Sequence, residues 1–134
     1  MTKESILLKL YILLVYSDGL ITTNEYKMGQ CMIKHEGIEE REFLNLVREY
    51  VDDNRNHIAR EVVLHMKNLP MQEQLRFVAW MNLIANADGF IDNREWSFIY
   101  MVYSELGLSL SDIISAQHEL KFSYQGELPR IALS

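Results

Sequence analysis

The feature that most constrains the fold is a short segment that occurs twice, 70 residues apart. Residues 18–26 read Asp-Gly-Leu-Ile-Thr-Thr-Asn-Glu-Tyr, and residues 88–96 read Asp-Gly-Phe-Ile-Asp-Asn-Arg-Glu-Trp. In both copies an apolar stretch precedes the Asp-Gly pair and an amphipathic stretch follows it. Glycine adopts the left-handed conformation that ends many helices without steric cost. Each copy therefore predicts a helix, a tight break and a second helix.

The start of the second helix carries its own signals in both copies. Thr22 is placed to cap that helix, and Glu25, three residues later, completes a capping box. Asp92 and Glu95 occupy the same two places in the second copy. Apolar residues flank each cap at the spacing of a hydrophobic staple, Ile21 with Tyr26 and Ile91 with Trp96.

The offset of 70 persists further along the chain. Gly37 and Gly107 each precede an apolar residue, and an acidic–apolar pair follows five residues after each glycine. Two helix junctions in register at one offset indicate an internal duplication. We therefore expect a single domain over residues 1–134, with repeat copies at about residues 1–55 and 70–121 and a tail at 122–134.

The hydrophobic periodicity predicts an all-α fold. Residues 6–15 and 75–87 are apolar almost all round, which is typical of helices surrounded by other helices. Five further stretches have an amphipathic helical period: 23–35, 40–53, 57–69, 93–106 and 110–121. No stretch alternates polar and apolar residues as a strand would. The sequence predicts about seven helices around two central apolar ones.

Composition excludes several classes of protein. An apolar content of 49% suits a globular core, and a net charge of −6 argues against nucleic-acid partners and anionic membrane surfaces. Cys31 is the single cysteine, so a disulfide framework is excluded and a reducing compartment, the cytoplasm, is expected. The apolar segment 6–15 is interrupted by Lys9 and is too short to span a bilayer, so we expect no membrane insertion.

The paired motif resembles the TerB-like family. The resemblance rests on a helix that ends in Asp-Gly-x-Ile-x-x-x-Glu, found twice, with a glycine–apolar break after each copy. It extends over nearly the whole chain. The family includes tellurite-resistance proteins and the helical N-terminal domain of membrane-anchored DnaJ-type co-chaperones. The resemblance implies a binding module related to stress response, with metal bound by matching acids. The chain lacks a J-domain signature and a transmembrane anchor, so the co-chaperone role is not implied.

The acids of the two loops are candidate ligands for a divalent cation such as Ca²⁺, Mg²⁺ or Mn²⁺. Aligned on an EF-hand loop, Asp88 falls at ligand position 5 and Glu95 at the bidentate position 12. The first position needs an oxygen donor, but Leu14 and Ile84 stand there, which excludes a conventional EF-hand. The predicted metal ligands are Asp18, Glu25, Asp88, Asp92 and Glu95.

The second loop is the richer in oxygen donors, since Asn86 and Asp92 add to its Asp88, so it is the one expected to bind if only one does. A competing interpretation assigns the same acids to helix capping alone and makes the protein a metal-free helical adaptor. Antiparallel central helices would hold the two loops apart, and a steep crossing would bring them together. In either case we expect an unidentified protein partner.

Other polar residues favour structural roles. His57, Glu61 and His65 share one helical face, which we interpret as a solvated stripe rather than a metal site. His35 lies near a helix C-terminus, where an imidazolium interacts favourably with the helix dipole. Trp80 and Trp96 have the spacing of core residues, although Trp96 has a half-exposed place over the second loop as an alternative. No nucleophile–base pair or phosphate-binding glycine loop can be assembled, so we do not expect an enzyme, and a hydrolase is the weakest alternative.

Overall fold

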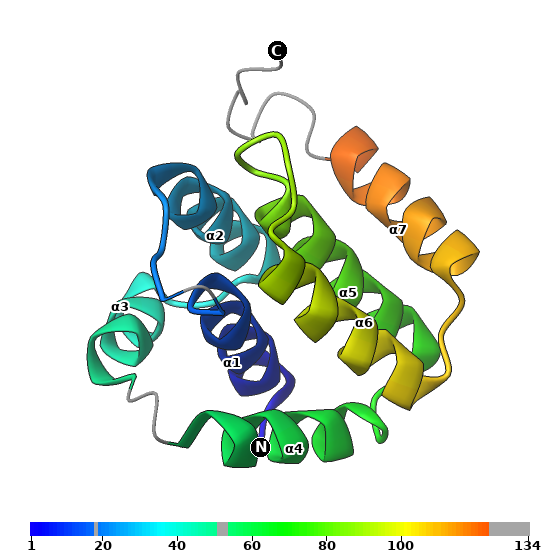
Figure 1. Cartoon of the computed structure of the whole chain (residues 1–134), viewed down its shortest axis with the longest axis horizontal. Coiled ribbons are helices and arrows are strands. Elements are labelled where there is room, and N and C mark those ends of the chain that lie inside the picture. Colours follow the sequence, from blue (N-terminus) through cyan, green and yellow to red (C-terminus); the bar gives the residue numbers. More distant parts are fainter. Residues whose placement is uncertain (18, 51–53, 124–134) are drawn as a thin grey trace.

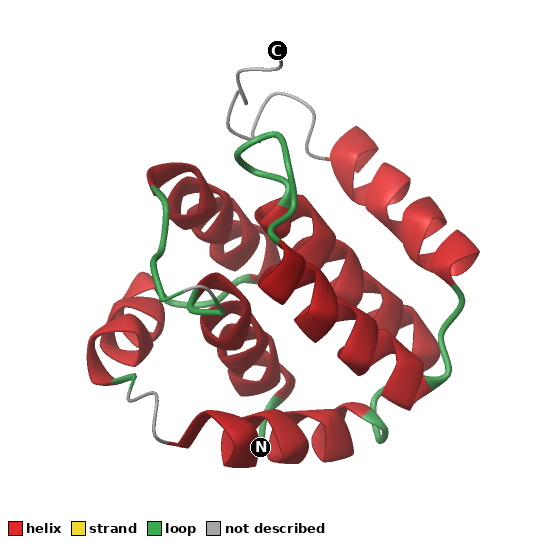
Figure 2. Cartoon of the chain, viewed as in Figure 1, coloured by secondary structure: helices red, strands yellow, loops and turns green. Residues whose placement is uncertain are grey.

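The computed structural model describes residues 1–17, 19–50 and 54–123, with side chains to Leu120. Within this part of the chain every regular element is a helix and no strand is present (Figure 2). The predicted all-α class and the count of seven helices are confirmed. In chain order they are α1 (Lys3–Val15), α2 (Thr23–Glu36), α3 (Glu40–Glu49), α4 (Arg55–Met66), α5 (Met71–Ala85), α6 (Asn93–Leu106) and α7 (Leu110–Ser123) (Figure 1).

The internal duplication is visible in the helix boundaries. α2 and α6 begin and end 70 residues apart, and α3 and α7 begin 70 residues apart. Gly37 and Gly107 end α2 and α6 with nearly identical φ angles of 70° and 69°. α1–α3 and α5–α7 thus follow one pattern. α4 lies between the two copies and has no counterpart among the described helices.

The two apolar helices form the centre of the fold. In α1 every residue from Ile6 to Val15 except Lys9 is buried, and α5 is buried continuously from Phe77 to Ala85. α1 packs against α3, α4 and α5, and α5 packs most extensively against α7. Trp80 is completely buried, as expected, whereas Trp96 is 38% exposed and so takes the alternative, half-exposed place. No described helix has the length and apolar content needed to cross a bilayer.

Several predicted boundaries were wrong. The helix predicted over 57–69 is α4, which spans Arg55–Met66. The helix predicted over 40–53 ends at Glu49, and residues 51–53, which include Asp52 and Asp53, lie outside the described residues. α7 continues through 122–123, where the tail was expected to begin, and 124–134 are outside the described part. α5 begins at Met71 instead of residue 75, because Gln74 Nε2 donates hydrogen bonds to the carbonyl oxygens of Met66 (2.8 Å) and Leu69 (3.1 Å). These hydrogen bonds hold the first turn of α5, which is polar and lacks the apolar periodicity of the rest of the helix.

A close contact between α1 and α2 sets the position of α2. A Cβ atom on Gly29 would lie 2.5 Å from Cε1 of Tyr11, so only glycine allows this approach. The Tyr11 hydroxyl donates a 3.3 Å hydrogen bond to the carbonyl oxygen of Glu25. Burial, and then the charge of Glu25, raise the pKa of Tyr11 far above its usual value. The hydroxyl therefore stays protonated and remains a donor.

Candidate functional site at the two Asp-Gly loops

The two loops have the same backbone conformation. Gly19 and Gly89 have φ angles of 88° and 90°, in the left-handed region that favours glycine. Each glycine N–H donates to the carbonyl three residues earlier, Tyr16 in the first loop (3.1 Å) and Asn86 in the second (2.9 Å). The predicted glycine breaks are confirmed, and each sets the direction in which the next helix leaves.

Gly89→Val is expected to lower the free energy of unfolding by about 1–2 kcal/mol or more. No atom lies within 4 Å of a Cβ built on Gly89, so the loss comes from forcing a β-branched residue into positive φ and not from a clash. Urea denaturation measures it. Gly89→Asn is the control, because asparagine tolerates the left-handed region and should lose less. Equal stability of the valine variant and the wild type would contradict this account of the loop.

The predicted capping box is present in the first copy. Thr22 Oγ1 accepts the backbone N–H of Glu25 (3.1 Å), and Glu25 Oε1 accepts the backbone N–H of Thr22 (2.9 Å). In the second copy Asp92 Oδ1 accepts the backbone N–H of Arg94 at 2.8 Å. Glu25 and Glu95, at equivalent positions, are 2% and 4% exposed. Glu25 and Asp92 thus each have a helix-capping role.

The two Asp-Gly junctions lie next to each other. Asn24, in the first turn of α2, donates a 3.0 Å hydrogen bond from Nδ2 to Oδ1 of Asp88 in the second loop. At their other ends, α1 and α5 are joined by an ion pair of 3.3 Å between Lys3 and Glu73. Since both ends meet, α1 and α5 run in the same general direction, as Figure 1 shows. This arrangement brings the second loop against the start of α2.

The first loop lies beside the start of α6. A cavity beside it is lined by Ser17 of the loop and by Arg94 and Ser97 of α6. Arg55, at the start of α4, donates a 2.9 Å hydrogen bond from Nη2 to Ser17 Oγ and lies over the ring of Phe98. The guanidinium group of Arg55 therefore stands beside the first loop, where its charge disfavours a bound cation.

The five predicted metal ligands are only partly brought together. Asp18 lies outside the described residues. Among the described residues no three His, Cys, Asp or Glu side chains gather closely enough to hold a metal ion. Asp88 is placed by Asn24, and Glu25 and Asp92 serve as caps. Oxygen donors that are near one another are thus concentrated at Asp88 and Asn24.

A half-buried polar network that the sequence did not predict joins α2 to α5. Glu36 Oε2 accepts hydrogen bonds from Arg76 Nε (3.0 Å) and Trp80 Nε1 (3.1 Å), and Arg76 Nη2 donates to Oε1 (3.0 Å). His35 Nδ1 is 2.9 Å from Glu36 Oε2, and its ring meets Trp80 edge-on. One feature of the sequence indicates this network. Glu36 is an acid in the last turn of a helix, where it opposes the helix dipole and needs a partner.

The histidine stripe of α4 is solvated, in agreement with its interpretation from the sequence. His57 Nε2 and Glu61 Oε1 are 3.3 Å apart, with side chains 68% and 47% exposed. An ion pair this exposed contributes little to stability. His57, Glu61 and His65 are not among the residues that line the cavity beside the first loop.

Comparison with known proteins identifies the family. Residues 4–118 match the family described as "Tellurite resistance protein TerB". No curated protein and no solved structure gives a significant match. The matched range runs from α1 into α7 and includes both Asp-Gly loops. The chain therefore belongs to the TerB family.

Proposed function

We propose that this TerB-family protein is a non-catalytic binding module that takes a divalent cation at its second Asp-Gly loop. The observation that supports this is the hydrogen bond between Asn24 and Asp88, which brings oxygen-bearing side chains of both repeats to one place. Carboxylate and amide oxygens are the ligands that Ca²⁺ and Mg²⁺ prefer. A net charge of −6 also favours the approach of cations.

The surroundings of the loops support the second loop over the first. Asp88 is the residue that we assign as the main ligand. A carboxylate has two oxygens, so a single capping bond at Asp92 or Glu25 leaves another oxygen available. Arg55, which donates a hydrogen bond to Ser17 of the first loop, disfavours a cation there. Glu95 and Asp18 are the remaining candidates.

Calorimetric titration of metal-free protein with calcium, magnesium, manganese and zinc tests the proposal. We expect heat of binding with at least one ion, and a stabilisation of about 2.7 kcal/mol when the free ion is 100 times its dissociation constant. Asp88→Asn removes the main charged ligand and Glu95→Gln a second, so the double variant should show neither effect. Asp112→Asn/Glu40→Gln is the matched control, because it makes the same two charge changes at exposed positions at the starts of α7 and α3. No heat with any ion, or equal binding by the double variant, would refute the proposed site.

A metal-free adaptor is the second candidate function, favoured by the capping bonds of Glu25 and Asp92. On this account the loop acids only shape the helix junctions. Asp88→Asn should then leave partner binding unchanged while Gly89→Val impairs folding. Loss of partner capture by Asp88→Asn alone would count against the adaptor.

Three further features complete the proposed function. The absence of a nucleophile–base pair in the sequence supports a non-catalytic role, and metal-dependent turnover lost with the same acids would instead indicate a hydrolase. The family's description, tellurite resistance, supports a role in stress response. The single cysteine, Cys31, supports a reducing compartment such as the cytoplasm.

A further inference from the structure

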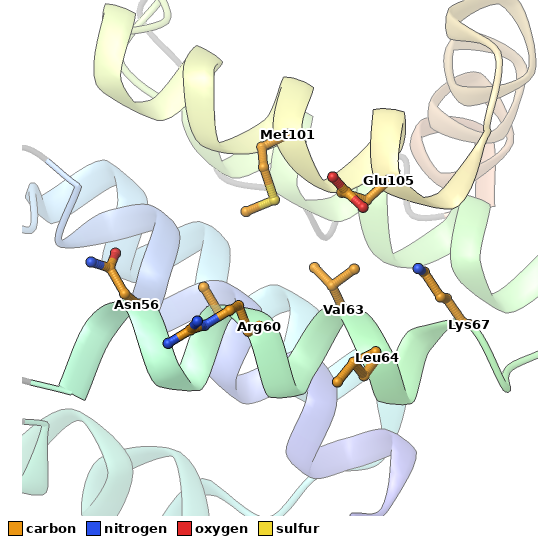
Figure 3. Close-up of a pocket in the computed structure, with 8 residues that line it drawn as sticks. Asn56, Arg60, Val63, Leu64, Lys67, Met101 and Glu105 are labelled. Atoms are coloured by element: carbon orange, nitrogen blue, oxygen red, sulfur yellow. The ribbon is translucent and has the colours of Figure 1, made fainter.

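An open groove runs between α4 and α6 (Figure 3). Its volume is about 680 Å³. Its floor is apolar, because Val63 points into it from α4 and Met101 points into it from α6 (Figure 3). Ala59 of α4 also lines it. Leu64, on the rim, is 61% exposed. A concave apolar surface between two helices has the form that accepts a third helix.

The rim of the groove carries charges of defined sign and spacing. Arg60 on α4 and Lys67, the residue that caps its C-terminus, lie on either side of Val63. They are seven residues apart, which is two helical turns or about 10 Å. Glu105 stands on the α6 side. Within the described part of the chain, none of these three charged side chains forms an ion pair with another residue. Their charges are therefore available to a ligand in the groove.

The positive rim is a local exception on an acidic chain. The net charge of −6 would repel an acidic partner at long range. At physiological ionic strength charges more than about 8 Å apart are largely screened. A residue that enters the groove therefore interacts first with Arg60 and Lys67. Charge complementarity thus selects an acidic edge on the α4 side and a basic residue near Glu105.

We propose that this groove binds an amphipathic helix of a partner protein. The helix would place an apolar stripe over Val63 and Met101 and two acidic residues, seven positions apart, against Arg60 and Lys67. α4 belongs to neither repeat copy, so the α4 side of the groove is not duplicated. This binding does not require a cation at the loops, so it is independent of the proposed cation site.

A library of displayed single-helix peptides, selected on the full chain in buffer with EDTA, tests the proposal. We expect the selected peptides to carry paired acidic residues seven positions apart around an apolar stripe. The double variant Arg60→Glu/Lys67→Glu should bind them about tenfold more weakly, since it turns two attractions into repulsions. The matched control is Arg41→Glu/Arg48→Glu, with the same charge change and spacing on exposed positions of α3. It should bind within about twofold of the wild type.

Circular dichroism should show that both double variants remain folded, because the four replaced side chains are exposed. Backbone amide shifts caused by a selected peptide should map to α4 and α6. The proposal is overturned if no peptide is selected, if the acidic spacing is missing, or if both double variants lose affinity equally. Binding of an anionic amphiphile such as oleate without any peptide binding would also reject a helix as the occupant.

Discussion

Glu36→Ala is expected to lower the free energy of unfolding by about 1–3 kcal/mol, as measured by urea denaturation. The Glu36 side chain is only 9% exposed and accepts hydrogen bonds from both Arg76 and Trp80. Alanine would remove the carboxylate that Arg76 and Trp80 share as an acceptor in a half-buried site, where the Arg76 side chain is 30% exposed. Loss of these charge-assisted hydrogen bonds is the main source of the destabilisation.

Two further variants distinguish loss of the Glu36 network from a general effect of mutation on stability. Glu40→Ala removes an exposed glutamate at the start of α3 and should change stability by no more than about 0.5 kcal/mol. The double variant Glu36→Leu/Arg76→Leu removes both charges. It should be less destabilised than Glu36→Ala, because the charge of Arg76 does not remain without Glu36. If Glu36→Ala is as stable as the wild type, the network does not hold α2 against α5.

The Glu36 network was missed because its partners are distant in the sequence. His35 was expected to interact with the helix dipole and Trp80 to fill the core, and each does lie in such a place. Their connection through Glu36 depends on the packing of the end of α2 against the middle of α5, 40 residues away. Helical periodicity reports which residues are buried, but it does not report which buried polar groups meet.

The helix junctions were predicted well because their interactions are local. The positive φ angles of Gly19 and Gly89 and the capping box of Thr22 and Glu25 each depend on residues within four positions of one another. The contact between the loops is different. It depends on the relative direction of α1 and α5, which the sequence left open and which the hydrogen bond from Asn24 to Asp88 reveals.

Phe43→Ala is the second substitution expected to have a large effect, a loss of about 3–5 kcal/mol in the free energy of unfolding. Phe43 is completely buried and is the only buried residue of α3. Its ring packs against Tyr11 and Tyr26, with centroids 5.1 Å and 5.6 Å away. The equivalent residue of the second repeat, Ile113 of α7, is also completely buried.

The neighbouring residue provides the control for this effect. Leu44 is 37% exposed, so Leu44→Ala removes similar chemistry from the same helix and should lose less than about 1 kcal/mol. Because Phe43 is the only buried residue of α3, with Leu46 and Val47 packed against the core while partly exposed, amide hydrogen exchange in α3 of the Phe43→Ala variant should be faster than in α5. Equal losses for the two variants, or uniform exchange across both helices, would mean that α3 is held by contacts along its length rather than by the ring of Phe43.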